Sequence, residues 1–271
     1  MLLPFLPGSQ DGLALPLSTM AQASGVLGPL LLPAGIPWLV YELRKQAQRR
    51  RGLPVQPRRL FFMLAALAAA SVVVLGLSLV GLATVGLSWC VLVLALWLYI
   101  VTRIVPGLRR EKAAETERLH PAPLHLVFLP VAVLAPQLAL AGPVTDFSRS
   151  RAIAQAAELI RDLEAHRARE GRYPASLAAV WKDYQPSVAG IERFRYAPNG
   201  EADDLFFEQP RFLLDNPGTR EFVVYNPRDQ HVMISHASWI LLLPAEELRR
   251  NQGWYAMHDV ASPHWKRFFF D

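Results

Sequence analysis

The sequence contains a single cysteine, Cys90, which lies inside an apolar run. One cysteine can form neither a disulfide within the chain nor a cysteine metal cluster. The sequence also lacks a Gly-x-Ser-x-Gly motif, a glycine-rich phosphate loop and a dinucleotide-binding fingerprint. We therefore predict no nucleotide cofactor and no nucleophile of these types, and we interpret Cys90 as a small packing residue.

Charge is scarce and unevenly placed. Only 19% of the residues are charged, below the roughly 25% of an ordinary soluble protein. The composition changes near Pro143, which predicts a membrane domain at 1–142 and a soluble domain at 143–271. The acidic residues before this boundary are Asp11, Glu42, Glu111, Glu115 and Glu117.

The net charge of +5 does not indicate a nucleic-acid partner. Residues 143–271 hold 16 Lys and Arg against 18 Asp and Glu, so the soluble part is not basic. The positive charge lies in short loops between apolar runs, where membrane topology explains it better than a polyanion does. The lipid bilayer is the expected partner of this half of the chain.

Two segments, residues 60–82 and 84–102, contain no charged residue. A helix of about 20 apolar residues crosses the hydrocarbon core of a bilayer. Only Ala83 separates the two segments, so the sequence predicts two membrane-spanning helices in a tight hairpin.

Residues 21–41 and 124–141 are also apolar, but prolines interrupt both. Proline is tolerated in membrane helices where neighbouring groups satisfy the freed carbonyls. We predict a kinked span at 21–41 and a shorter fourth span at 124–141. The conspicuous polar residues of the fourth span are His125 and Gln137, and the lack of acidic residues or Arg at this depth argues against a transporter.

The loops between these segments differ in charge. Seven Lys and Arg lie between the first and second spans, five lie between the third and fourth, and none precedes Arg44. Short loops rich in Lys and Arg stay in the cytoplasm. The sequence therefore predicts an outer N-terminus, two inner loops and an outer domain at 143–271. A basic segment typical of a cleaved signal peptide is lacking, so we expect no cleavage.

Residues 143–271 have the patterning of a soluble α+β domain. Apolar residues recur at helical spacing over 149–170, and Gly171 suits the left-handed position after a helix. Further helices are predicted after Pro174 and over 244–250. We expect an antiparallel sheet of three or four strands packed on the long helix. The strands are predicted within 191–197, 205–208, 221–225 and 231–235.

The segment AELIRDLEAHRAREGRYPASLAAV, residues 157–180, resembles the helix-to-loop junction of type II secretion pseudopilins and type IV pilins. The resemblance implies a head in which a membrane helix continues into an amphipathic helix, a Gly-Arg-Tyr-Pro turn and an antiparallel sheet. It also implies a place in the bacterial cytoplasmic membrane and envelope. The span at 124–141 lacks the prepilin leader and its Glu, and three spans precede it. We therefore transfer the fold of the head and not the role of a fibre subunit.

Histidines form the best candidate cluster of metal ligands in the outer domain. His231, His236, His258 and His264, with Asp259, provide ligands suited to zinc or copper. Their spacings of five and six residues match no common metal motif. The alternative interpretation is that they are ordinary surface or core residues, and no metal site is predicted.

Two further groups in the outer domain have two interpretations each. Glu201, Asp203 and Asp204 form either a solvated turn or a calcium-binding turn. The aromatic tail, residues 254–271, either packs under its own sheet or docks on a partner or the bilayer.

These patterns predict a non-enzymatic integral membrane protein. It would present a pilin-like α+β domain on the outer face of the cytoplasmic membrane, as a scaffold or interaction module for other envelope proteins. The alternative is a membrane-bound enzyme or metal-binding protein that uses the outer histidines.

Overall fold

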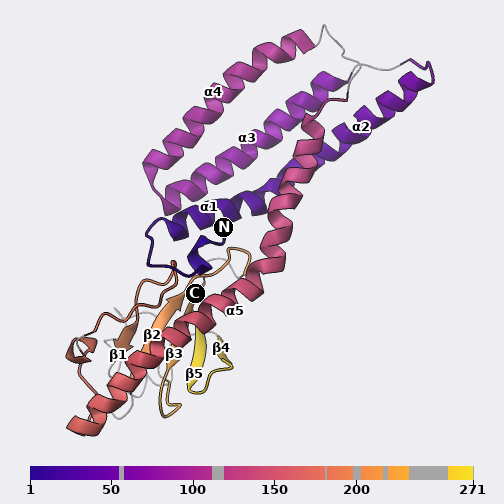
Figure 1. Cartoon of the computed structure of the whole chain (residues 1–271). Coiled ribbons are helices and arrows are strands. Elements are labelled where there is room, and N and C mark those ends of the chain that lie inside the picture. Colours follow the sequence, from indigo (N-terminus) through magenta and orange to yellow (C-terminus); the bar gives the residue numbers. More distant parts are fainter. Residues whose placement is uncertain are drawn as a thin grey trace. The chain divides into compact units, whose positions relative to one another are not determined.

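The computed structural model describes residues 1–54, 58–111, 119–180, 182–197, 203–215, 219–231 and 256–270 (Figure 1). The chain divides into two compact units. Unit 1 contains Thr19–Leu140 with Met1, and unit 2 contains Leu2–Ser18 with Ala141–Asp271. The first residues of the chain, placed with the membrane half on sequence grounds, thus belong to the unit that contains the sheet.

Unit 1 is helical. Within the described residues, four helical segments are long and apolar enough to cross a membrane, in the regions predicted from the sequence. These segments are Ala14–Arg50, Arg59–Thr84, Leu87–Pro106 and Ala122–Glu170. The helices that form them are α1 (Ala14–Leu27), the 3₁₀ turn η2 (Gly28–Leu31), α2 (Leu32–Arg50), α3 (Arg59–Thr84), α4 (Leu87–Glu111) and α5 (Ala122–Glu170).

The first segment is interrupted where its prolines lie. The 3₁₀ turn η2 separates α1 from α2, which is the break that the prolines predict. Pro29 and Pro33 occupy the first positions of η2 and α2, where the missing N–H removes no helical hydrogen bond. Pro37 lies inside α2.

Helices α3 and α4 form the predicted hairpin. The connection runs through Val85 and Gly86, and Gly86 has a φ of 115°, which favours glycine. Gly81 lets the helices approach closely, because a Cβ at this position would overlap the Trp89 ring. Farther from the connection, Trp97 Nε1 of α4 donates a hydrogen bond to Ser71 Oγ of α3 at 3.2 Å.

Helix α5 is a single helix of 49 residues, Ala122–Glu170. The predicted span at 124–141 and the predicted amphipathic helix at 149–170 are parts of this one helix, which runs through Gly142-Pro143 without a break. If the chain left the helical conformation within an apolar segment, its backbone N–H and C=O groups would lose their hydrogen-bond partners. This loss costs more free energy than a proline kink. The predicted end is confirmed, since Gly171 has a φ of 73° and its N–H bonds to the Arg167 carbonyl at 2.8 Å.

Unit 2 contains a five-stranded antiparallel sheet of order β1-β2-β3-β5-β4 (Figure 1). The sheet has more strands than the three or four predicted, because residues 254–271, where no strand was predicted, supply β4 and β5. The predicted strand at 231–235 and helix at 244–250 lie almost entirely outside the described residues, and the helix predicted after Pro174 is a 3₁₀ turn, Leu177–Val180. The strands are β1 (Arg195–Ala197), β2 (Asp204–Gln209), β3 (Arg220–Tyr225), β4 (Ala256–Asp259) and β5 (Trp265–Phe270).

The sheet is apolar on both faces. One face and α5 share a core, to which α5 contributes Ala152, Ala156, Leu159 and Leu163 and the sheet contributes Leu205, Phe207, Val223 and Trp265. Residues that alternate with these along the strands form a second buried cluster of Phe222, Val224, Phe268 and Phe270. The described aromatic residues of the tail therefore pack in their own sheet; Trp254 and Tyr255 lie outside the described residues.

The N-terminal segment is tied into unit 2 by backbone hydrogen bonds. Pro7 and Val188 form an antiparallel bridge. Gly190 donates to the Pro4 carbonyl at 2.8 Å, and a Cβ on Gly190 would lie 2.6 Å from that oxygen. The Phe5 ring stacks on the Phe212 ring at 4.6 Å. The segment thus forms part of the core of unit 2.

Candidate functional site: an arginine-lined pocket

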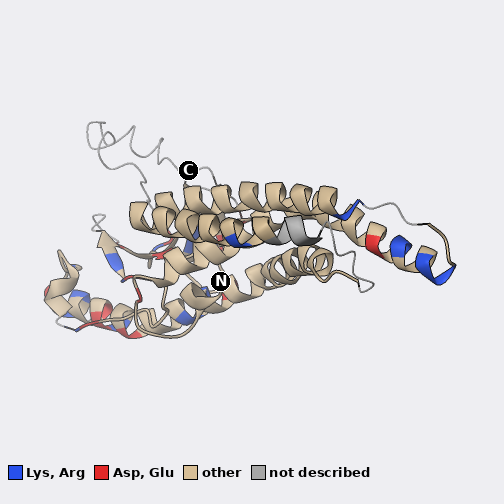
Figure 2. Cartoon of the chain, turned by 90° about the horizontal axis from the view of Figure 1, so that it is seen from above, with Lys and Arg blue, Asp and Glu red and all other residues tan. Residues whose placement is uncertain are grey.

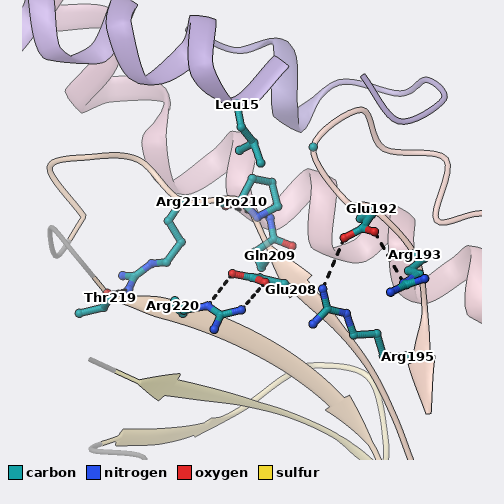
Figure 3. Close-up of a pocket in the computed structure, with 11 residues that line it drawn as sticks. Leu15, Glu192, Arg193, Arg195, Glu208, Gln209, Pro210, Arg211, Thr219 and Arg220 are labelled. Atoms are coloured by element: carbon teal, nitrogen blue, oxygen red, sulfur yellow. Dashed lines mark hydrogen bonds and ion pairs between the residues drawn. The ribbon is translucent and has the colours of Figure 1, made fainter. Parts of the chain in front are cut away.

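A pocket of about 300 Å³ lies in unit 2 where β2 ends and β3 begins (Figure 3). The register pairs Gln209 with Glu221, so the last residues of β2 and the first residues of β3 lie together. The loop before β1 and the first turn of α1 complete the lining. The lining residues are Leu15, Gly190, Glu192, Arg193, Arg195, Glu208, Gln209, Pro210, Arg211, Thr219 and Arg220.

Four arginines and two glutamates line this pocket. Arg220 forms a bidentate pair with Glu208, with N–O distances of 2.8 and 2.7 Å. This hydrogen bonding raises the pKa of Arg220. Glu192 is shared, at 3.4 Å from Arg195 and 3.7 Å from Arg193. The cations outnumber the carboxylates within the lining, and Arg211 is also paired with Asp215 at 3.3 Å and Glu221 at 3.6 Å outside it.

A buried ion cluster lies directly beside the pocket. The Glu221 side chain is 1% exposed and accepts a hydrogen bond from Arg149 Nη2 of α5 at 2.9 Å. Its other oxygen lies 3.6 Å from Arg211 Nε. The Arg211 guanidinium also lies 4.8 Å from the centre of the Phe269 ring. Glu221 thus joins α5 to a pocket-lining arginine and limits the movement of that arginine.

Gln209 lines the pocket beside this cluster. Its Nε2 donates to Ser148 Oγ of α5 at 2.6 Å. Within the part of the chain that the structure describes, its buried Oε1 has no hydrogen-bond partner. The amide is therefore held through its Nε2 atom, and Figure 3 shows the side chain among the residues that line the pocket.

This arrangement can bind an anionic group. Guanidinium groups donate paired hydrogen bonds that match a carboxylate or phosphate. Arg193, Arg220 and Arg195 are accessible, with side chains 67%, 47% and 36% exposed, and of these Arg220 is already held by Glu208. The sequence does not predict this pocket, because its arginines are spread over three segments; their only local signal is the charge within the strand segments IERFRYA and REFVVY.

The candidate metal ligands do not come together. Among the described residues, no group of three His, Cys, Asp or Glu side chains could hold a metal ion. His264 Nδ1 lies 3.0 Å from Asp229 Oδ2, and His231 Nε2 lies 3.0 Å from the His264 carbonyl oxygen. Burial lowers the pKa of His231. His258, on β4, packs against the Phe269 ring.

Asp259 and His236 are the remaining candidate metal ligands. Asp259 lies 3.9 Å from Lys266 Nζ, and its own side chain is 90% exposed. His236 lies outside the described residues. The alternative function, a metal-binding protein or membrane-bound enzyme, thus gains no supporting geometry from the described histidines.

The carboxylates predicted in a solvated turn are buried. Asp203 accepts a hydrogen bond from the Tyr196 hydroxyl, and burial with this carboxylate raises the pKa of Tyr196. Asp204, the first residue of β2, accepts a hydrogen bond from Asn226 Nδ2 at 2.8 Å. Both side chains therefore hold strand ends together. Glu201 lies outside the described residues.

The structure also places the polar residues of the apolar helices. Gln137 is 1% exposed and lies against Gly25, where any Cβ would overlap its Oε1 atom. His125 Nδ1 lies 2.9 Å from the carbonyl oxygen of Pro121, the residue just before α5 begins. Cys90 is a free, partly exposed thiol in α4.

Comparison with known proteins finds no family model, no curated protein and no solved structure that matches this chain. The architecture and the arginine-lined pocket are therefore the evidence on function.

Proposed function

We propose that the protein is a non-enzymatic membrane protein that presents unit 2 on the outer face of a bacterial cytoplasmic membrane, as a scaffold or interaction module. Helix α5 carries this proposal. Its first part, up to Ala141, is apolar and about 30 Å long at 1.5 Å per residue, enough to cross the hydrocarbon core. The rest of the same helix forms the core of unit 2 with the sheet. A head built on the continuation of a span is suited to display at a membrane surface.

The turn after α5 supports a pilin-like head. The Tyr173 hydroxyl donates to Glu164 Oε1 at 2.6 Å, and the Arg167 guanidinium lies 4.9 Å from the centre of the Tyr173 ring. Burial and the Glu164 carboxylate raise the pKa of Tyr173 to about 12. The Gly-Arg-Tyr-Pro segment thus folds back on the helix before the chain enters the antiparallel sheet, in the element order that the resemblance implies.

Reporter fusions test the orientation. We expect alkaline phosphatase fused after residue 83 or 145 to be active, because the enzyme folds only outside the cytoplasm, and fusions after residue 50 or 115 to be inactive. Enzyme activity per fusion protein, normalised by immunoblot, is the measurement. An active fusion at 115 together with an inactive one at 145 would place unit 2 in the cytoplasm and overturn the proposal.

We further propose that the arginine-lined pocket is where unit 2 binds an acidic segment of a partner protein. The excess of arginine over glutamate in the lining supports this, because the charge attracts carboxylates and the forked donors orient them. Arg193 and Arg195 are accessible and share a single carboxylate, Glu192. A partner carboxylate would restore one-to-one pairing.

Substituting Arg193→Ala and Arg195→Ala together is expected to weaken binding of a synthetic oligo-glutamate peptide about tenfold, since about 1.4 kcal/mol of charge-assisted hydrogen bonding is lost. The full chain in neutral detergent, titrated by isothermal calorimetry, provides the measurement. The control is Arg169→Ala with Arg172→Ala, which removes equal charge outside the pocket lining. Equal weakening in both variants, or no binding to the unchanged protein, would reject the pocket as the binding site.

A further inference from the structure

Large apolar side chains are exposed at few places in unit 2. Among its described residues, eight such side chains are exposed. Two of them, Leu214 and Met257, lie far along the chain from the apolar helices. The other six lie in the N-terminal segment, residues 2–18, or in the first turns of the part of α5 that belongs to unit 2, where the chain passes into the apolar helices. These six are Leu3, Leu6, Leu13, Leu15, Leu17 and Phe147.

The start of α1 has the reverse polarity of a helix at a water-facing surface. Ala14 and Ser18, one turn apart on α1, are buried, with exposures of 0% and 1%. Leu13, directly before α1, is 63% exposed, and Leu15 and Leu17 are also exposed. A helix at a surface in water has the opposite arrangement, with its leucines inside and its small polar residues outside. The exposed face at this end of α1 is therefore suited to an apolar environment.

The 3₁₀ turn η1 (Leu3–Phe5) and the residue after it present two further leucines from a fixed backbone. Phe5 is buried against Phe212, whereas Leu3 and Leu6 are exposed. The Leu6 carbonyl accepts a hydrogen bond from the Ala189 N–H at 3.0 Å, which holds this turn to the rest of unit 2. The exposed leucines are therefore part of the folded surface of unit 2.

The N-terminal segment carries almost no charge. Asp11 is the only charged side chain in residues 1–41. Its Oδ1 atom accepts a hydrogen bond from the Leu13 N–H at 2.9 Å, and its own N–H donates to the Ala189 carbonyl at 3.1 Å. The next charged residues lie toward the end of α2, where Figure 2 shows blue residues next to a single red one. Any contact through the N-terminal segment therefore depends on its apolar side chains.

The chain limits how far these residues lie from the apolar helices. Leu13 is about 9 Å from Thr19, the first residue of the main part of unit 1, at 1.5 Å per helical residue. Phe147 lies about 9 Å beyond Ala141 along α5. Amphipathic segments insert about 5–10 Å into the boundary between the headgroups and the acyl chains of a bilayer. If the apolar helices span a bilayer, these side chains lie within reach of its surface.

We propose that the N-terminal segment contacts the outer leaflet of the membrane, with Leu3, Leu6 and Leu13 inserted at the boundary between the headgroups and the acyl chains. Lipid fits this surface better than a soluble partner, because such a partner would have to enter the headgroup layer to reach it. The inference rests on the proposed display of unit 2 at a membrane and identifies the surface of unit 2 that touches the lipid. It does not depend on the arginine-lined pocket.

Spin labels on the full chain test this contact in vesicles of phosphatidylcholine and phosphatidylglycerol. In a Cys90→Ser chain, Leu3→Cys, Leu6→Cys or Leu13→Cys carries a nitroxide; all three positions are exposed, so the label replaces no core contact. Paramagnetic resonance measures collisions with oxygen, which concentrates in lipid, and with a nickel chelate, which stays in water. The oxygen-to-nickel ratio should be at least about threefold higher than for the control Met257→Cys, an exposed apolar position on β4.

A label at Leu79→Cys on α3, where the side chain is 58% exposed, separates the outcomes. If this label met mainly oxygen while the three leucine labels met the chelate as often as the Met257 label, the inference would fail and the proposed membrane display would stand. If the Leu79 label also met the chelate freely, both would fail. Leucine labels shielded from both reagents would show that protein covers the surface instead of lipid, and spin–spin broadening that disappears on dilution with unlabelled chain would identify that protein as a second copy; either result overturns the inference.

Discussion

Replacing Glu221 with Ala is expected to destabilise unit 2 by about 3–5 kcal/mol. Glu221 is 1% exposed and lies between Arg149 and Arg211, whose side chains are 8% and 10% exposed. Without the carboxylate, both guanidinium groups lose their shared buried partner and keep, among the described residues, only the exposed carboxylates of Asp146, at 2.6 Å from Arg149, and Asp215, at 3.3 Å from Arg211. Removing the buried partner of a charge costs more than the net worth of the pair.

Hydrogen exchange of the full chain in detergent measures this effect. Amides of β3 and β5 in Glu221→Ala should exchange at least about a hundredfold faster than in the unchanged protein, if they open with unit 2. The control is Glu208→Ala, which removes a bidentate carboxylate from a partly exposed pair with Arg220 and should cost at most about 1 kcal/mol. Similar exchange in the two variants would show that the buried cluster is not a structural centre of unit 2.

The helices of unit 1 could be predicted because their signal is local. Uncharged runs of about 20 residues specify a spanning length without reference to the rest of the chain. The continuity of α5 through Gly142-Pro143 is harder to predict, because the local proline favours a break while the apolar surroundings favour a continuous helix. The end of α5 followed from Gly171 itself, whereas the connection predicted at Ala83 lies at Val85 and Gly86.

The sheet was predicted where turns bound short apolar runs and missed where they did not. Strands β2 and β3 lie between clear turn signals. Strand β5 (Trp265–Phe270) contains Phe268, Phe269 and Phe270 in succession, and all three are buried. A strand buried on both faces does not alternate apolar and polar residues as a half-exposed strand does. The sequence of residues 254–271 therefore shows no period-two pattern.

The arginine-lined pocket depends on strand register, which single residues do not encode. Arg195 and Arg220 are distant in sequence and meet because β1 pairs with β2 and β2 with β3. The histidines show the converse. His258 and His264 are close in sequence, yet one lies on a strand and the other in a turn with a φ of 64°. Proximity along the chain is a poor guide to a site when the sheet is built from non-local pairs.

The N-terminal segment is the strongest case of a non-local contact. Phe5 is fully buried, stacks on Phe212 and lies in a segment whose backbone bonds to residues 187–190. Gly190 fits because a Cβ there would lie 2.6 Å from the Pro4 oxygen. Residues that begin the chain therefore complete the core of a unit formed mostly by its second half, and Leu15 of the same segment lines the arginine-lined pocket.

Replacing Phe5 with Ala should therefore destabilise unit 2 by about 3–5 kcal/mol, the range for truncating a buried phenylalanine. Hydrogen exchange of the full chain should show faster exchange in residues 187–190 and in the sheet. The neighbouring Leu6→Ala is the matched control, since Leu6 is 44% exposed and its loss should cost at most about 0.5 kcal/mol. If Phe5→Ala changed exchange only within residues 2–11, the segment would be a loosely attached arm, and the pocket would keep its lining without it.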